Sequence, residues 1–314
     1  MAYDLSRFRG VFPAALTMFD RENNLDLDAT AKHWDWLIRQ GSHGLVIAGT
    51  SGEFIAMENS ERVELFRLAK QVTAGRVPLV YGAGHYSTKL TIDLCNQAQT
   101  HGADAVIVIL PYYMKPPKAA VIRHYRDIRK AVDVPIMLYN NPGSSGCVDL
   151  SPREIAELVE EDVLHMVKQT YESVVPVRDL RYLVDDRMRI FYGSFQSPFE
   201  AMLAGAHGWI SGVLNVIPRA AGALYRACVV EKNAQKGWDI LQRTLPLVHL
   251  MTHQLIGPVS DLAIYRAILN LWGLQGGYSR NPFYPLSDEQ QATLRRILTD
   301  TGWMNPDHVL DGVA

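Results

Sequence analysis

Apolar and polar positions alternate along the chain in two rhythms. Short runs of mostly apolar residues are typical of buried strands, and the longer segments between them repeat their apolar positions with the period of an amphipathic helix. The strand-like runs cover residues 11–16, 44–48, 78–81, 103–110, 134–139, 164–168, 189–193 and 208–211. The helical segments cover about 27–39, a stretch from Ser60, 88–101, 119–132, a stretch from Ser151, 173–184, and stretches from Pro198 and Pro218.

Eight strand–helix units in a row favour parallel strands, because parallel neighbours need a long crossover connection. This number of units predicts a closed (β/α)8 TIM barrel rather than an open, doubly wound sheet. Beyond about residue 232 the strand pattern stops, and helical patterns follow at about 235–252, 258–273 and 287–301. We therefore expect a barrel domain over residues 1–231 and an all-helical C-terminal extension over 232–314 that packs on it.

Composition narrows the function classes. Of the 314 residues 48% are hydrophobic, and the formal net charge is −2, so no basic surplus points to a nucleic acid or an anionic membrane. No apolar segment reaches the roughly 18–20 residues that span a bilayer, and the N-terminal residues lack the apolar core of a signal peptide. Cys95, Cys147 and Cys228 form neither an even disulfide set nor a CxxC motif, which favours reduced thiols in a cytoplasmic protein.

One of the apolar runs ends in a residue that is ordinarily charged. Residues 163–170 read Val-Leu-His-Met-Val-Lys-Gln-Thr, so Lys168 closes a predicted buried strand. A buried ammonium costs free energy unless it is paired, neutralised or used in chemistry. Catalytic groups of parallel barrels lie at the C-terminal ends of strands, which is where Lys168 is expected. A strand-end lysine can also reach solvent or pair with a carboxylate, so this residue alone does not establish catalysis.

Three other strand ends carry polar residues around the same predicted opening. The fifth strand ends in Tyr139 before Asn-Asn-Pro-Gly, the second runs into Gly-Thr-Ser-Gly-Glu at 49–53, and the fourth runs into Pro-Tyr-Tyr at 111–113. Each has an ordinary interpretation when taken singly: an amphipathic rim tyrosine, a plain loop, or an interface patch. Together with Lys168 they predict a pocket.

This combination fits amine catalysis. Lysine is nucleophilic only as the neutral amine, and the apolar neighbours Leu164 and Met166, expected on the strand face of Lys168, disfavour the charged form. A neutral amine attacks a ketone to give an iminium, an electron sink for C–C cleavage or elimination. The hydroxyl of Tyr139 on the adjacent strand suits proton transfer. Hydroxyls and backbone N–H groups of the glycine-bracketed loop at 49–53 suit a substrate carboxylate.

Four motifs, in their order and spacing, resemble the dihydrodipicolinate synthase / N-acetylneuraminate lyase family. They lie at residues 49–53, 111–113, 139–142 and 167–170, and the likeness covers about residues 8–300. The resemblance implies a class I, pyruvate-type Schiff-base aldolase or lyase on a (β/α)8 barrel that needs neither a metal nor an organic cofactor. It also implies a homotetramer built as a dimer of tight dimers.

The resemblance implies a role for each matching side chain. Lys168 matches the Schiff-base lysine, and Tyr139 matches the proton-transferring tyrosine. Thr50 matches the residue that links Tyr139 to Tyr113, which in the family reaches in from a neighbouring subunit. Thr50 and Ser51 match the clamp on the keto-acid carboxylate.

Two departures from the family pattern bear on the substrate. Synthases carry an arginine that reads the carboxylate of the aldehyde partner, and Ser144 stands in its place without a charged fork. Sialic acid lyases carry Asp-Glu after the glycine that matches Gly193, which is followed here by Ser-Phe and Gln196. The backbones of Gly193 and Ile210 match positions that line the pocket. We expect Ser144 and Gln196 to face a neutral, partly apolar tail of the keto acid.

The sequence thus predicts a lyase that acts on a 2-keto acid. The reaction is either aldol cleavage or condensation that releases or uses pyruvate, or dehydration of a 2-keto-3-deoxy acid; Ser144 argues against a true dihydrodipicolinate synthase. An alternative is a catalytically silent barrel of the same family that binds a keto acid or a sugar acid. The spacing of histidines and carboxylates contains no recognisable metal motif. His85 either lines the pocket or lies in a loop.

Overall fold

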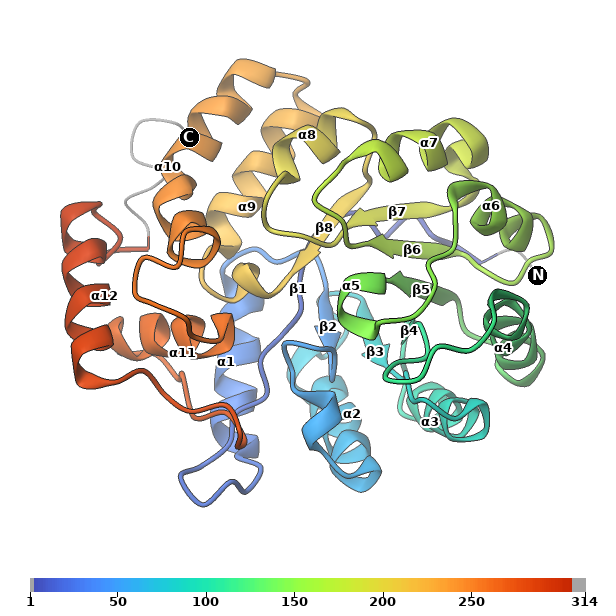
Figure 1. The fold of residues 1–314 in the computed structure, drawn as a ribbon, viewed down its shortest axis with the longest axis horizontal. Coiled ribbons are helices and arrows are strands. Elements are labelled where there is room, and N and C mark those ends of the chain that lie inside the picture. Colours follow the sequence, from blue (N-terminus) through green and yellow to red (C-terminus); the bar gives the residue numbers. More distant parts are fainter. Residues whose placement is uncertain (1–2, 307–314) are drawn as a thin grey trace.

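Eight parallel strands form the centre of the molecule (Figure 1), and the predicted (β/α)8 barrel is confirmed. The structure is a computed structural model that describes residues 3–306. Neighbouring strands follow the order β1-β8-β7-β6-β5-β4-β3-β2, and a parallel bridge between Ala14 and Val46 joins the two ends of this order. The strands are β1 (Gly10–Pro13), β2 (Leu45–Ile47), β3 (Leu79–Gly82), β4 (Ala105–Ile109), β5 (Ile136–Asn140), β6 (Met166–Gln169), β7 (Arg189–Tyr192) and β8 (Gly208–Ser211).

Helices surround the barrel and continue beyond it. Around the barrel lie α1 (Leu27–Arg39), α2 (Asn59–Thr73), α3 (Thr88–Thr100), α4 (Lys118–Ala131), α5 (Pro142–Ser145), α6 (Pro152–Glu160), α7 (Val175–Val184), α8 (Pro198–Leu203) and α9 (Pro218–Tyr225). Short 3-10 or π turns cover Phe54–Ala56, Asp185–Arg187, Gly212–Asn215 and Arg226–Val230. The helical stretch expected from Ser151 is present as α6, where Ser151 and Glu154 form a capping box ahead of Pro152.

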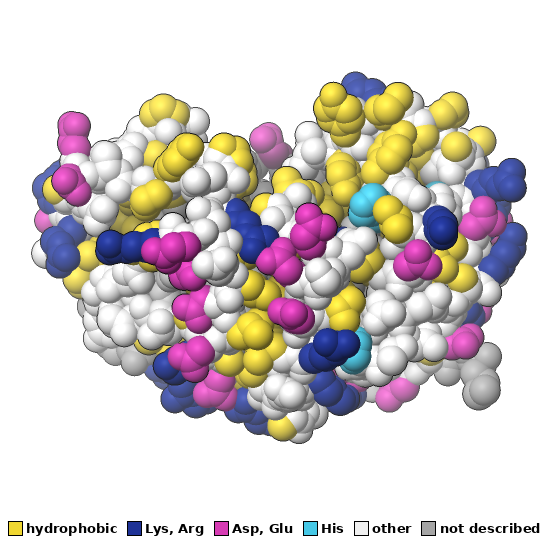
Figure 2. All heavy atoms as spheres, turned by 90° about the horizontal axis from the view of Figure 1, so that it is seen from below, with side chains coloured by type: hydrophobic (Ala, Val, Ile, Leu, Met, Phe, Trp, Pro, Cys, Tyr) yellow, Lys and Arg dark blue, Asp and Glu magenta, His cyan; other side chains and the backbone are white. Residues whose placement is uncertain are grey.

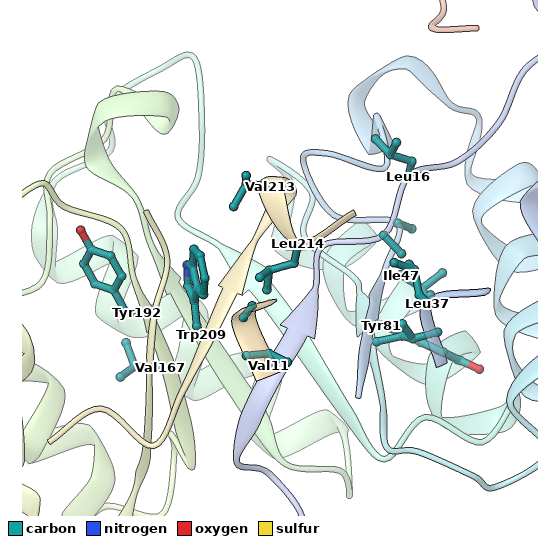
Figure 3. Close-up of a cluster of buried hydrophobic side chains, with 14 of the residues drawn as sticks. Val11, Leu16, Leu37, Ile47, Tyr81, Val167, Tyr192, Trp209, Val213 and Leu214 are labelled. Carbon is teal, nitrogen blue, oxygen red and sulfur yellow. The ribbon is translucent and has the colours of Figure 1, made fainter. Parts of the chain in front are cut away.

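The strands are apolar on both faces because both faces are buried. Side chains that point inward, such as Phe12, Met137 and Phe191, fill the barrel interior. A second, larger core lies between the strands and the helices, and Figure 3 shows Tyr192 and Trp209 in it, on β7 and β8. This double burial explains why the strand-like runs in the sequence are continuous rather than alternating.

One expectation about strand β6 is wrong. Leu164 was expected to share the strand face of Lys168, but Leu164 packs in the outer core. The strand begins only at Met166, and the Leu164 N–H still bonds to the carbonyl of Leu158 at the end of α6. The alternation of strand faces therefore does not extend back to residue 164. Met166 does lie in the interior core with Tyr139.

The C-terminal part contributes α10 (Ala234–Thr252), α11 (Asp261–Leu271) and α12 (Asp288–Asp300), which lie together on one side of the barrel in Figure 1. The helix predicted from residue 258 starts only at Asp261, because Ser260 caps it by accepting the N–H of Leu262. The division between a domain at 1–231 and an extension at 232–314 stays a prediction, and residues 307–314 of that extension lie outside the described part of the chain.

The surface carries charges of both signs. On the face shown in Figure 2, basic and acidic side chains are interspersed, and neither sign forms a continuous patch. Many surface charges of the described residues pair, as Arg126 does with Glu161 at 2.7 Å and Arg129 with Asp162 at 2.9 Å. None of the helices in residues 3–306 has the length and apolar character to cross a membrane.

Candidate active site

Lys168 and Tyr139 lie side by side near the C-terminal ends of their strands. Tyr139 on β5 pairs in register with Lys168 on β6. Both side chains line one pocket, where the Lys168 Nζ lies 4.1 Å from the centroid of the Tyr139 ring. Lys168 is 5% exposed and Tyr139 is 8% exposed. The lysine that the sequence singled out is therefore held out of bulk water, against the tyrosine that the sequence placed beside it.

The hydroxyl of Tyr139 is held by Asn141. The Asn141 Nδ2 donates to the Tyr139 hydroxyl oxygen at 2.9 Å, and the Asn141 Oδ1 accepts the backbone N–H of Ser144 at 3.2 Å. Asn141 is the N-cap of the short helix α5, and Pro142 occupies its first turn. The sequence Asn-Pro-Gly-Ser thus builds a capped turn whose capping side chain also fixes the orientation of the tyrosine.

Opposing effects act on the ionisation of Tyr139. Burial raises the pKa of its hydroxyl, whereas the nearby charge of Lys168 lowers it. Hydrogen bonds with Thr50 and Asn141 lower the pKa further, and the net result is a pKa below the ordinary tyrosine value. The surroundings of Tyr139 therefore favour loss of its proton, which is the property that a proton carrier needs.

The pocket around these residues is largely apolar. Its cavity volume is about 20 Å³. Its apolar walls come from the interior faces of several strands and from Phe54, and the full lining is Ala14, Val46, Ala48, Gly49, Thr50, Phe54, Gly82, Gly84, Ile107, Ile109, Tyr139 and Lys168. Among these described residues Lys168 is the one charged side chain.

The loop after β2 brings Thr50 to the pocket. Thr50 lines it together with Gly49, and in the single chain the Thr50 side chain is otherwise exposed. Ser51 lies beside Thr50 and close to Gly212, which follows β8. A Cβ built on Gly212 would lie 2.6 Å from the Ser51 Oγ. Ser51 and Thr50 both line an adjoining cleft toward α11.

Glu53 fixes the loop at residues 49–53 to the C-terminal part of the chain. Glu53 has a left-handed backbone conformation with φ of 58°. Its Oε1 accepts from the Arg266 Nη2 at 2.6 Å, and its Oε2 accepts the backbone N–H of Arg280 at 2.9 Å. Both partners of the Glu53–Arg266 pair are buried. The loop that carries Thr50 is thereby fixed to α11 and to the segment after it.

The backbone of Gly193 lies next to Lys168, whereas neither Gly193 nor Ile210 is among the residues that line the pocket. A Cβ on Gly193 would collide with the Thr170 hydroxyl and would lie 3.0 Å from the Lys168 Cε, so a glycine is needed for this close approach. Ile210 is fully buried in the interior core with Tyr139.

Three predicted site residues lie away from the pocket within the single chain. Tyr113 is 93% exposed and has a left-handed backbone with φ of 74°. Ser144 and Gln196 are also exposed, and neither belongs to the pocket lining. His85 lies in the loop after β3, where its Nδ1 accepts the Ser87 N–H at 3.1 Å, and it is not among the lining residues.

Sequence reasoning missed several residues that shape the site. Asn141 was quoted only as part of a motif, although its position before Pro142 is an N-cap signal. The role of Glu53 had no local signal, because Arg266 is distant in sequence. No group of three His, Cys, Asp or Glu side chains in residues 3–306 is arranged to hold a metal ion.

Comparison with known proteins shows the family of the chain. The sequence model of the Dihydrodipicolinate synthetase family matches residues 7–301. The chain belongs to this family. Members of the dihydrodipicolinate synthetase family are class I lyases, and the resemblance inferred from the four motifs is therefore confirmed.

Individual relatives cover nearly the whole chain. The 4-hydroxy-tetrahydrodipicolinate synthase of Methanothrix thermoacetophila is 32% identical over 293 residues, which are 93% of this chain and 96% of that protein. Two solved family structures contain pyruvate. YagE, a prophage protein from E. coli K12, has a TM-score of 0.85 at 28% identity and covers 94% of this chain and 99% of its own. The Acinetobacter baumannii dihydrodipicolinate synthase, described as chloride inhibited, has the same TM-score, identity and coverage.

Proposed function

We propose that the protein is a class I lyase that forms a Schiff base between Lys168 and a 2-keto acid. The observation that carries this proposal is the buried contact between the Lys168 Nζ and the Tyr139 ring at 4.1 Å, inside an apolar pocket. A buried amine beside a tyrosine hydroxyl is the pair of groups that imine formation needs. Membership of the dihydrodipicolinate synthetase family supports it.

In the proposed first step the neutral Lys168 amine attacks the ketone carbon of the substrate. A C=N bond replaces the C=O bond, and the carbonyl oxygen leaves as water with one proton from the amine nitrogen and one from solvent. The Tyr139 hydroxyl carries these protons between the nitrogen, the oxygen and solvent. The resulting iminium withdraws electrons from the neighbouring carbons, which permits cleavage or formation of a C–C bond, or elimination of water.

The remaining site residues take supporting roles in the proposal. Thr50 and Ser51 bind the carboxylate of the keto acid, and the Thr50 hydroxyl also connects Tyr139 with Tyr113 of a neighbouring subunit. The backbones of Gly193 and Ile210 line the bound substrate. The hydrogen bond between Thr50 and the Tyr139 hydroxyl supports this arrangement.

We propose a homotetramer, a dimer of dimers, located in the cytoplasm. The 93% exposure of Tyr113 supports a position in which a second subunit receives this side chain. The three cysteines are free and buried, which supports a reducing compartment.

For the substrate we propose a keto acid whose tail is neutral. Pyruvate is the proposed product or co-substrate, supported by its presence in the structures of YagE and of the Acinetobacter baumannii enzyme. The proposed reaction is aldol cleavage, condensation or dehydration rather than dihydrodipicolinate synthesis. Ser144 supports this, since a serine offers no guanidinium to bind a second carboxylate. Gln196, near the same end of the barrel, presents a neutral amide.

Reductive trapping tests the proposal. Sodium borohydride with pyruvate is expected to add a stable, reduced pyruvate adduct to the peptide that contains Lys168, detected by mass spectrometry. Lys168→Ala is expected to abolish the adduct, whereas Lys115→Ala, at an exposed loop lysine, is the control and keeps it. An unmodified Lys168 peptide at saturating pyruvate would refute the Schiff-base assignment.

A screen of 2-keto-3-deoxy acids then identifies the reaction. Coupling to lactate dehydrogenase detects released pyruvate and marks an aldolase, whereas loss of substrate without pyruvate marks a dehydratase. Absence of turnover across the panel, together with keto-acid binding that Lys168→Ala leaves unchanged, would instead favour the catalytically silent barrel.

A further inference from the structure

Arg62 is a buried cation without a carboxylate partner. It extends from α2 and is 2% exposed. Its Nη1 donates to the carbonyl of Gly84 at 3.2 Å and its Nη2 to the carbonyl of Gly82 at 2.5 Å, while its Nε has no hydrogen-bond partner. Within residues 3–306 no Asp or Glu forms an ion pair with it. Burial lowers the pKa of Arg62 to about 10, so the side chain still carries its charge at neutral pH.

Burying an unpaired guanidinium in this way costs free energy in the protein alone. Moving a guanidinium out of water costs several kcal/mol, and neutral carbonyl groups return only part of this. Buried charges in proteins are therefore normally paired. The contrast within this chain is direct, because the other fully buried arginine of the site region, Arg266, is paired with Glu53 at 2.6 Å.

The unpaired charge lies directly behind the proposed keto-acid pocket. Gly82 and Gly84, whose carbonyls it binds, both line the pocket with Lys168. The Arg62 Cζ lies 5.3 Å from the ring centroid of Phe54, which is another lining residue. No carboxylate lies among the described lining residues. Arg62 thus places a permanent positive charge beside the pocket, and no carboxylate among the described lining residues opposes it.

We propose that Arg62 is a specificity-determining residue whose permanent charge complements the carboxylate of the bound substrate. The inference rests on the proposed function and assigns to Arg62 a preference for 2-keto acids over uncharged ketones of the same size. Arg62 acts through space and does not touch the ligand, since Phe54 and the two glycine carbonyls stand between them. The anion that enters the pocket supplies the countercharge that the empty protein lacks.

The size of the effect follows from Coulomb's law. Two opposite charges about 10 Å apart at an effective dielectric constant of about 20 change a binding constant by about tenfold. Salt screens such a buried pair only weakly. The preference is therefore expected to persist at an ionic strength that would suppress attraction by surface lysines.

The test compares two ligands that differ in charge and little else. Borohydride trapping at Lys168 is measured against the concentration of pyruvate and of pyruvamide, its uncharged amide. Arg62→Met is expected to raise the half-saturating pyruvate concentration about tenfold and to leave that of pyruvamide within about twofold. Arg62→Lys keeps the charge and is expected to keep most of the preference. Arg76→Met removes an exposed arginine before the other end of β3 and serves as the control, with no change for either ligand.

Equal weakening of both ligands by Arg62→Met would show that Arg62 only supports the end of β3, and would overturn the proposal. Unchanged trapping of both would do the same. If Arg62→Met does not fold, Arg62→His provides the measurement. The preference for pyruvate over pyruvamide is then expected to disappear at a pH where the imidazole is neutral. A preference that persists at that pH would refute the role of the Arg62 charge. Failure of pyruvate to trap the wild-type protein would refute the proposed function itself, which keeps the two failures distinct.

Discussion

The amine of Lys168 faces the ring of Tyr139, not its hydroxyl group alone. The Lys168 Nζ lies 4.1 Å from the ring centroid, while the hydroxyl oxygen accepts a hydrogen bond from Asn141 at 2.9 Å. The ring and the hydroxyl of Tyr139 therefore have separable tasks. The ring covers the amine and shields it from water, and the hydroxyl is left to exchange protons.

Tyr139→Phe separates these tasks, because it keeps the ring and removes the proton carrier. Turnover of a pyruvate-releasing substrate is expected to slow by about 10²–10⁴-fold, while the pyruvate concentration that half-saturates the protein changes only a few-fold. Steady-state kinetics and equilibrium binding measure the two quantities. Tyr81→Phe, which removes a buried hydroxyl on the helix side of β3, is the control and should leave turnover unchanged. Full activity of Tyr139→Phe would remove this residue from proton transfer.

A mixture of two inactive variants tests whether Tyr113 serves a neighbouring subunit. Tyr113 is 93% exposed in its own chain, so its hydroxyl has no local site to complete. Tyr113→Ala and Lys168→Ala are each expected to be nearly inactive alone. In a mixed dimer one site combines an intact Lys168 with an intact Tyr113 from the partner subunit. Random mixing is therefore expected to restore about a quarter of the wild-type activity. No recovery, in a mixture shown by mass spectrometry to contain mixed dimers, would place the Tyr113 function within one chain.

The strand ends could be predicted because parallel strands carry their C-terminal ends to one rim. Lys168 and Tyr139 each lie one residue before the end of their strand, and these consecutive strands are neighbours in the barrel, so the contact followed from the order of the chain. The same reasoning failed for Leu164, because a period-two pattern says nothing about where a strand begins. Here the end of α6 controls the backbone up to residue 164.

Contacts between residues that are far apart in the sequence could not be predicted from local sequence patterns. Glu53 and Arg266 are separated by 213 positions, and nothing in either neighbourhood indicates the other. Arg62 lies on the buried face of α2, in helical period with Leu65 and Phe66, but the pattern of a charged residue there does not show that its side chain reaches the carbonyls of β3 and the ring of Phe54. Periodicity predicts the face of a helix, whereas the path of a long side chain depends on the packed structure.

The Glu53–Arg266 pair is expected to stabilise the protein and to hold Thr50 in place. Glu53→Gln leaves the buried Arg266 charge uncompensated, so the free energy of unfolding is expected to fall by about 3–5 kcal/mol. Urea denaturation measures this change. Glu61→Gln is the matched control, because Glu61 also pairs with an arginine of the C-terminal segment, Arg280, but is more exposed and does not belong to the Thr50 loop.

The double variant Glu53→Gln/Arg266→Met tests the coupling. Removing both charges is expected to cost less than the sum of the two single substitutions, because no buried charge is left unpaired. Pyruvate trapping by Glu53→Gln is expected to weaken, while Glu61→Gln traps normally. Additive losses in the double variant would show that the two side chains act independently.

Acid is expected to destabilise the fold through buried histidines. Burial lowers the pKa of His33 to about 4, from an ordinary value of 6.5, despite the hydrogen bond of its Nε2 with Asn215. Between these two pH values the unfolded chain binds a proton that the folded chain does not, so the free energy of unfolding falls as the pH is lowered. The expected loss is about 1.4 kcal/mol per pH unit for one such histidine.

Urea unfolding at pH 7 and at pH 5 measures this linkage. His33→Gln, whose amide can still donate to Asn215, is expected to lose less stability between the two pH values than the wild type. The dependence is reduced and not abolished, since burial also lowers the pKa of His124 and of His207 to about 4. His253→Gln, at an exposed position after α10, is the control. Equal losses in His33→Gln and the wild type would assign the acid sensitivity to other groups.

Ser144→Arg tests whether the missing guanidinium determines the substrate. Ser144 contributes to the Asn141 cap through its backbone N–H and not through its side chain, so this substitution leaves the support of Tyr139 intact. The Ser144 side chain is exposed, and an arginine there has room to extend. A charged hydrogen bond contributes about 1.5–3 kcal/mol. The kcat/KM for condensation of pyruvate with a carboxylated aldehyde is therefore expected to rise by about 10–100-fold, and that for an uncharged aldehyde to stay the same.

Ser144→Gln, with similar reach but no charge, separates charge from bulk. An equal rise with both aldehydes, or no rise with either, would mean that Ser144 does not account for the substrate preference, and that the choice of aldehyde is made elsewhere in the pocket.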